Sequence, residues 1–136
     1  MGHELNGKTL GIVGFGRIGR NIGKMAKACG MSLIAYDPLL TDEQIRSGDA
    51  EPVTFDKLIE RSDVITLHVP LIESTRHMIS NKEFEKMKNN TIIINTSRGG
   101  IIDEEALCKA LSSGKLLGAG LDVFEEETRK QVKAVE

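Results

Sequence analysis

The segment from Gly14 to Gly19, with the sequence GFGRIG, constrains the fold of this chain more than any other feature. It follows the apolar run Leu10 to Val13 and opens a helical pattern. An acidic residue, Asp37, closes the next apolar run along the chain. A G-x-G-x-x-G turn between a strand and a helix, with such an acidic residue after the second strand, is typical of a site that binds a dinucleotide.

Each glycine of this turn has a separate task in that interpretation. We expect Gly14 to permit the tight turn out of the strand, Gly16 to let the backbone approach a pyrophosphate, and Gly19 to let the helix pack close to the sheet. The helix that begins near Arg17 offers unpaired N–H groups and the positive end of its dipole, which favour an anion. Arg17 and Ile18 are therefore predicted to lie beside the phosphates.

Asp37 is predicted to select the type of dinucleotide. Its carboxylate can accept hydrogen bonds from the adenosine ribose hydroxyls and would repel a 2′-phosphate, so the sequence favours NAD over NADP. The alternative is a glycine turn that serves packing alone, with Asp37 capping a turn or helix. The context of strand, turn and helix favours the cofactor site.

Composition limits the chain to one domain and to a restricted set of partners. With 136 residues it is long enough for one core, and we expect no second, substrate-binding domain. A formal net charge of −2 with 28% charged residues gives no nucleic-acid footprint and favours a small-molecule partner. No apolar run approaches the ~20 residues of a membrane span, and the N-terminus has no secretory signal. We therefore expect a cytoplasmic protein that contacts no membrane.

Cys29 and Cys108 are the only cysteines, and they form no C-x-x-C pair. Each falls on the apolar stripe of a predicted helix, so both are predicted to be buried core thiols rather than metal ligands or nucleophiles. The sequence predicts no metal site.

Short β-rich apolar runs alternate with helical patterns, which indicates a parallel sheet. Right-handed crossovers would arrange the strands in the doubly wound order 3-2-1-4-5-6 of a Rossmann-type, three-layer α/β/α fold. A very short edge strand at Glu51 to Val53 would bring the total to about six. The other predicted strands are Thr9 to Val13, Ser32 to Tyr36, Val64 to Val69, Thr91 to Asn95 and Ala119 to Val123.

The first helix is predicted to bury the face that carries Ile18, Ile22, Met25 and Cys29, and to end at Gly30 in a left-handed conformation. Capping residues mark the starts of four later helices. These are Thr41 with Gln44, Thr54 before Leu58 and Ile59, Ser80 with Glu83 before Phe84 and Met87, and Asp103 before Leu107, Cys108 and Leu111. Gly48 and Gly114 would end the first and last of these four.

Several separate motifs together resemble one family, the NAD-dependent D-isomer-specific 2-hydroxyacid dehydrogenases, and especially their D-3-phosphoglycerate dehydrogenase branch. The similarity extends from about Glu4 to Glu127, with the motifs in the order of the family. They are Gly14 to Gly19, Tyr36-Asp37-Pro38, Leu67-His68-Val69-Pro70-Leu71, Asn95-Thr96-Ser97-Arg98-Gly99 and Gly118-Ala119-Gly120-Leu121-Asp122-Val123-Phe124.

The resemblance implies a role for each matching position. Arg17 and Ile18 would meet the pyrophosphate, and Asp37, followed by Pro38, would hold the adenosine ribose. The turn His68-Val69-Pro70 would line the adenine side, with His68 as a hydrogen-bonded wall residue rather than a catalyst. The segment Thr96-Ser97-Arg98 would flank the nicotinamide, and Asp122 would hold its carboxamide.

Two charged residues are candidates for the reaction itself. Arg98 can grip a carboxylate with two parallel hydrogen bonds and polarise a neighbouring carbonyl. The resemblance assigns it to substrate binding and catalysis, and assigns Glu127 to orienting a catalytic histidine and raising its pKa. The alternatives are a surface ion pair for Arg98 and a solvated charge for Glu127 within its acidic run.

The chain departs from the family after Glu127. The Pro-His segment that supplies the family's general acid is absent, and so is the substrate domain, so we expect residues 1–127 to form an NAD-binding domain followed by a short polar, helical tail at 128–136. Without a positioned acid and a closed cleft, the chain alone should be a very poor dehydrogenase. A homodimer is a further expectation, because cofactor domains of the family commonly pair.

Three functions remain open at this level. The first is a dinucleotide-binding domain without complete catalytic machinery. The second is one part of a dehydrogenase that a partner chain completes. The third is a noncatalytic scaffold, against which Asp37, Arg98 and Asp122 argue together because packing requires no charges at strand ends.

Overall fold

The computed structural model describes residues 5–97 and 99–121, which form a single parallel sheet flanked by helices. Its strands are β1 (Thr9–Val13), β2 (Ser32–Tyr36), β3 (Glu51–Pro52), β4 (Val64–Leu67), β5 (Thr91–Asn95) and β6 (Leu116–Leu121). Its helices are α1 (Arg17–Ala28), α2 (Asp42–Arg46), α3 (Phe55–Arg61), α4 (Asn81–Lys86) and α5 (Glu104–Ser112).

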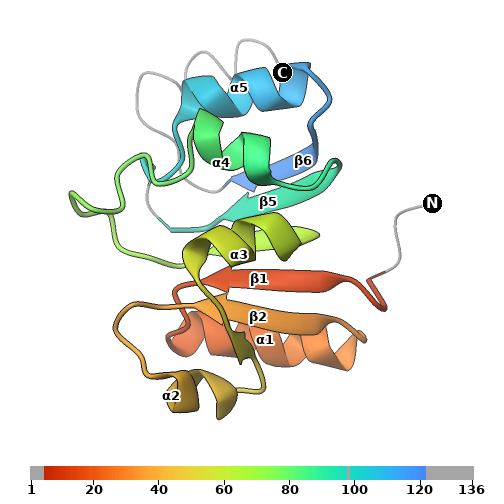
Figure 1. Ribbon diagram of the computed structural model, residues 1–136, viewed down its shortest axis with the longest axis vertical. Helices are drawn as coiled ribbons and strands as arrows, with labels where there is room; N and C mark the ends of the chain where they lie inside the picture. Colours follow the sequence, from red (N-terminus) through yellow and green to blue (C-terminus); the bar gives the residue numbers. More distant parts are fainter. Residues whose placement is uncertain (1–4, 98, 122–136) are drawn as a thin grey trace.

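The strand order is β3-β2-β1-β4-β5-β6, which confirms the predicted doubly wound topology. Figure 1 shows α3, α4 and α5 on the near face of the sheet and α1 behind β2 on the far face. A separate apolar cluster fills each side: one gathers Leu58, Phe84 and Leu107 from the near helices, and the other gathers Phe15, Leu33 and Ile45. The three-layer α/β/α arrangement is therefore confirmed.

The register of the sheet aligns the ends of its central strands. Val13 pairs with Tyr36 on one side and with Leu67 on the other, and Leu67 pairs with Asn95. Since all strands are parallel, the residues that follow these four positions emerge at one carboxyl edge, where ligands bind in open α/β sheets.

The predicted helix starts are confirmed by their capping bonds. Thr41 Oγ1 accepts from the Gln44 amide at 3.2 Å, while Gln44 Oε1 accepts from the Thr41 amide at 2.8 Å. Thr54 caps α3 through the Lys57 amide, and Asp103 caps α5 through the Ala106 amide. At Ser80 the Glu83 carboxylate accepts from the Ser80 amide, as predicted.

The buried face of α1 differs from the predicted one. Ile18 and Met25 are each 64% exposed, whereas Gly19 and Gly23 are buried against the sheet. The reason is proximity: a Cβ at Gly19 would lie 2.5 Å from the Gly14 carbonyl oxygen. The helix begins so close to the glycine turn that no side chain fits at Gly19, and Ile18 and Met25 are turned outward. Of the predicted face, Ile22 is half-buried and packs against the apolar cluster on this side of the sheet, as expected.

The prediction that both cysteines are buried was also wrong. Cys29 and Cys108 are exposed. Cys29 is the C-cap residue of α1, and Gly30 follows it with φ +86° as predicted. On α5 the buried residues include Ala106, Leu107 and Ala110, while Leu111 is 41% exposed. Cys108 therefore lies off the packed face of its helix.

Three strand boundaries differ from those predicted. β4 ends at Leu67, two residues short of Val69, and β6 begins at Leu116 rather than at Ala119. β3 contains only Glu51 and Pro52, one residue short of Val53. The predicted end of the last strand, Val123, lies outside the described residues. None of the helices in residues 5–97 and 99–121 is long and apolar enough to cross a membrane.

Candidate functional site

The glycine turn lies at the carboxyl edge of β1, wedged against the residue that follows β4. Gly14 has φ +90°, a conformation that side chains disfavour, and a Cβ there would lie 2.2 Å from the His68 carbonyl oxygen. The His68 amide in turn donates to the Val13 carbonyl at 2.7 Å. Gly14 is thus required by the packing of two strand ends, in agreement with its predicted task.

A pocket of about 350 Å³ opens beside this turn. Its lining residues come from the glycine turn, the end of β4 and the end of β5: Gly16, Arg17, Ile18, Gly19, His68, Val69, Thr96 and Ser97. The structure thus brings together eight of the residues predicted from sequence.

Gly16 differs from the other two glycines of the motif. A Cβ at Gly16 would meet no atom within 4 Å, and Gly16 has φ −83°, so neither packing nor backbone conformation in the described chain requires glycine there. The residue lines the pocket at the N-cap of α1, and unpaired amides at a helix N-terminus favour an anion. This open cradle fits the close approach of a pyrophosphate.

Asp37 joins β2 to the glycine turn. Its Oδ2 accepts from the Phe15 amide at 2.9 Å, and its Oδ1 accepts from the Leu39 amide at 2.9 Å. The carboxylate therefore stabilises the turn, as the capping alternative predicts. Its position at the end of β2 also fits the predicted ribose contact. Pro38, which follows, is exposed and does not line the pocket beside the turn.

His68 is a wall of the pocket, as expected. Its Nε2 lies 2.8 Å from the buried Thr66 Oγ1, and burial lowers the pKa of its imidazole, which favours the neutral ring. Val69 lines the same pocket, while Pro70 is exposed and outside it.

The β5 side of the pocket is shaped by Asn95, which sequence reasoning did not single out. Asn95 is 2% exposed, and its Oδ1 accepts from both the amide and the hydroxyl of Ser97. This turn fixes the direction in which the chain leaves the strand. An asparagine at the end of an apolar run, two residues before a serine, was the available signal.

Arg98, Asp122 and Glu127 lie outside the described residues, as does the predicted tail at 128–136. No cluster of metal-ligating side chains occurs in the part of the chain that the structure describes.

Another pocket, of about 370 Å³, lies between α4 and α5, where Phe84, Lys109 and Ala110 are among its lining residues. Neither the glycine turn nor the carboxyl ends of the central strands reach it. We therefore place the functional site at the carboxyl edge, where the backbone geometry demands glycine and the strand ends converge.

The doubly wound sheet and the glycine turn with its acidic partner define a Rossmann-type dinucleotide-binding domain. A family model described as "D-isomer specific 2-hydroxyacid dehydrogenase, NAD binding domain" matches residues 1–135. The chain belongs to this family, and its cofactor is NAD. The match extends past residue 127, the predicted end of the domain.

Relatives and solved structures agree with that membership. The chain is 54% identical over 127 residues to a glyoxylate reductase of Thermococcus litoralis, covering 93% of the chain and 38% of the relative. It is 52% identical over 130 residues to a D-3-phosphoglycerate dehydrogenase of Methanocaldococcus jannaschii, covering 95% and 25%. A D-lactate dehydrogenase of Aquifex aeolicus, solved with NAD and lactic acid, superposes with a TM-score of 0.88 at 39% identity, covering 99% of the chain and 40% of that structure. The chain thus spans less than half the length of these proteins.

Proposed function

We propose that this domain binds NAD(H) in preference to NADP(H) and serves hydride transfer to or from a D-2-hydroxy acid. The observation that carries the cofactor preference is the position of Asp37 at the end of β2, with one oxygen 2.9 Å from the amide of Phe15 in the glycine turn. A carboxylate there can accept from ribose hydroxyls, and it would repel a 2′-phosphate.

Within this proposal, the cofactor extends along the carboxyl edge over two neighbouring pockets. Asp37 lines a separate pocket at the β2 end, whereas the first turn of α1 and the residues Thr96 and Ser97 at the β5 end line the pocket beside the glycine turn. An adenosine at Asp37 and a pyrophosphate at Gly16 direct the nicotinamide half toward β5. Bound there, the cofactor would supply or accept the hydride.

The charged candidates complete the proposal through the family resemblance. We assign Arg98 to gripping the substrate carboxylate, Asp122 to the nicotinamide carboxamide, and Glu127 to a catalytic histidine. The substrate is proposed only as a class, a D-2-hydroxy acid or its 2-oxo form, because the relatives named above act on different members of it.

Calorimetric titration of the purified chain with NADH and, in parallel, NADPH tests the proposal. Saturable binding that favours NADH would support it, and addition of a 2-oxo acid would then reveal whether the chain alone turns over. A folded chain that binds neither cofactor would overturn it and would favour the scaffold alternative.

A homodimer is proposed as the assembly. The flank of α1 outside the cofactor pocket, where Met25 is 64% exposed, is a surface that association could cover. The opposite flank is already occupied, since Arg20 donates to the Gln44 carbonyl of α2. Sedimentation equilibrium over a wide concentration range tests this: a monodisperse monomer at the highest concentration would refute it, and Met25→Lys should weaken any dimer observed.

A further inference from the structure

The two loops that follow β4 and β5 are joined into one hydrogen-bonded unit, although they are far apart in sequence. The His77 amide donates to the Gly100 carbonyl at 2.7 Å, and the Asp103 amide donates to the Ile79 carbonyl at 2.8 Å. Between these bonds, Ile79 and Ile102 form a parallel β-bridge. Residues 100–103, which lead into α5, are therefore held by the β4–α4 loop.

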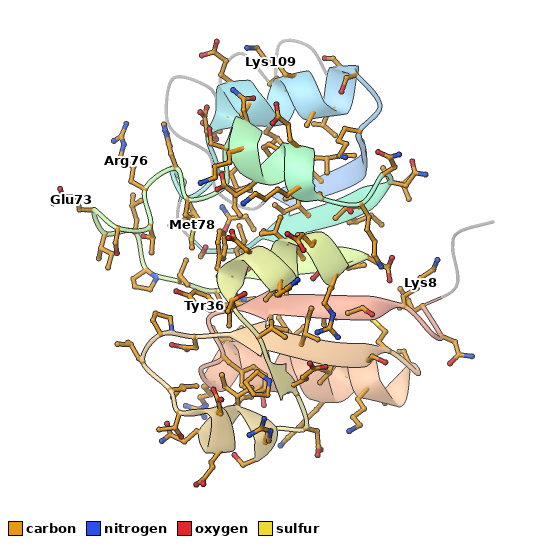
Figure 2. The ribbon with its side chains drawn as sticks, in the orientation of Figure 1. Lys8, Tyr36, Glu73, Arg76, Met78 and Lys109 are labelled. Carbon is orange, nitrogen blue, oxygen red and sulfur yellow. The ribbon has the colours of Figure 1, made fainter. Side chains whose placement is uncertain are left out.

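The side chains at the β-bridge are also buried in the core. Ile79 and Ile101 are fully buried, and Ile102 is 2% exposed. Figure 2 shows Glu73 and Arg76 on the projecting part of the β4–α4 loop, while Met78 lies back toward the body of the protein. The loop thus has a free outer portion and an anchored base, and the base is the part joined to the β5–α5 segment.

One side-chain pair closes the unit. Ser80 Oγ donates to Asp103 Oδ2 at 2.9 Å, linking the N-cap residue of α4 to the N-cap residue of α5. Partial burial acts to raise the pKa of Asp103, but hydrogen bonds from Ser80 and the Ala106 amide, with the nearby His77, hold that pKa below its ordinary value. The carboxylate is therefore ionised near neutral pH, and its bond to the hydroxyl is charge-assisted.

We infer that Ser80 and Asp103 are positioning residues for the nicotinamide end of the cofactor pocket. Neither residue of the pair lines the pocket. Their bond holds Asp103, at the α5 end of the loop that follows β5, and Asn95 holds Ser97 at the β5 end, and this pair of anchors is the basis of the inference. Binding sites depend on such supporting contacts, because a small displacement of a wall residue weakens its contacts with the ligand.

The inference rests on the proposed function, and its test separates the two halves of the cofactor. In the proposed function NADH extends along the carboxyl edge from Asp37 to Ser97, whereas ADP occupies only the adenosine and pyrophosphate part. Ser80→Ala should weaken NADH binding by about fivefold, the effect of losing about one hydrogen bond between the cofactor and the displaced wall, and should change ADP binding by less than about twofold. Ser80→Thr, which keeps the hydroxyl, should restore the wild-type ratio of the two affinities.

Thr91→Val is the matched control. Like the Ser80 hydroxyl, the Thr91 hydroxyl donates one hydrogen bond, from Oγ1 to the Lys88 carbonyl at 2.7 Å. Thr91 begins β5 at the edge of the sheet opposite the glycine turn, and it lines neither the pocket beside that turn nor the pocket that contains Asp37. The variant should lower the melting temperature as Ser80→Ala does, and it should leave the NADH-to-ADP affinity ratio unchanged.

The outcomes are distinct. If the wild-type chain binds NADH and Ser80→Ala changes both ligands equally, or neither, the positioning role is overturned while the proposed function stands. If Thr91→Val shifts the ratio as much as Ser80→Ala, the effect is general destabilisation and the role is overturned too. If the folded wild-type chain binds neither ligand, the proposed function fails and this inference fails with it.

Discussion

The carboxylate of Asp37 accepts a hydrogen bond from the backbone amide of Phe15 at 2.9 Å, which links the end of β2 to the centre of the glycine turn. Phe15 is fully buried, so both its side chain in the core and this backbone hydrogen bond anchor the turn. The same carboxylate also accepts from the Leu39 amide. One residue therefore shapes the turn and presents the negative charge on which cofactor selection would depend.

Asp37→Ala is expected to weaken NADH binding and to reduce the preference over NADPH, because both the ribose acceptor and the repulsion of a 2′-phosphate are removed. It should also lower the free energy of unfolding by about 1–2 kcal/mol, since the Phe15 and Leu39 amides lose their acceptor. Calorimetry with both cofactors and urea unfolding measure the two effects. Unchanged affinities for both cofactors would refute the selective role, whatever happens to stability.

Gly16→Ala and Gly14→Ala should separate binding from folding. A Cβ at Gly16 meets no atom within 4 Å, so the alanine variant should keep the wild-type melting temperature and lose about tenfold or more in NADH affinity. A Cβ at Gly14 would collide with the His68 carbonyl, and φ +90° is strained for alanine, so that variant should lose about 1–3 kcal/mol of stability or more. A Gly16→Ala chain that binds NADH normally would contradict the placement of the pyrophosphate.

His68 should make stability depend on pH in the mildly acidic range. Burial lowers the pKa of His68 in the folded chain below the value of about 6.5 that it has when unfolded. The unfolded state then binds the proton first, so the stabilising contribution is complete above about pH 6.5 and is lost as the pH falls below it. The decrease in melting temperature from pH 7.5 to pH 5.5 should be smaller in His68→Gln than in the wild-type chain. An equal decrease in both would show that His68 does not cause the pH dependence.

Both cysteine thiols should react in the native state. Cys29 and Cys108 are exposed, so a thiol reagent such as 5,5′-dithiobis(2-nitrobenzoate) should modify both without denaturant. Cys29→Ser and Cys108→Ser assign the two reactions. Modification that occurs only after unfolding would show that these positions are buried, as the helical pattern suggested.

No pattern in the sequence predicted the hydrogen bonds between the β4–α4 and β5–α5 loops or the exposed flank of α1, but the sequence did determine most of the local structure. Alternating apolar runs specified the strands, and Thr41, Thr54 and Asp103 specified helix starts, because caps act through bonds only a few residues long. The glycine motif predicted the position of the pocket at the carboxyl edge, because its spacing indicates a strand, a turn and a helix that follow one another directly in the sequence.

Only the tertiary structure decided which side of α1 is buried. The apolar pattern favoured Ile18 and Met25, yet the backbone of the glycine turn excludes a side chain at Gly19, and a Cβ at Gly23 would lie 3.1 Å from Leu33 Cδ1. The bond between Ser80 and Asp103 likewise joins residues 23 positions apart, and no local pattern encodes it. Hydrophobic periodicity and capping motifs report neighbours along the chain, whereas interlayer distance and contacts between loops arise when distant segments pack together.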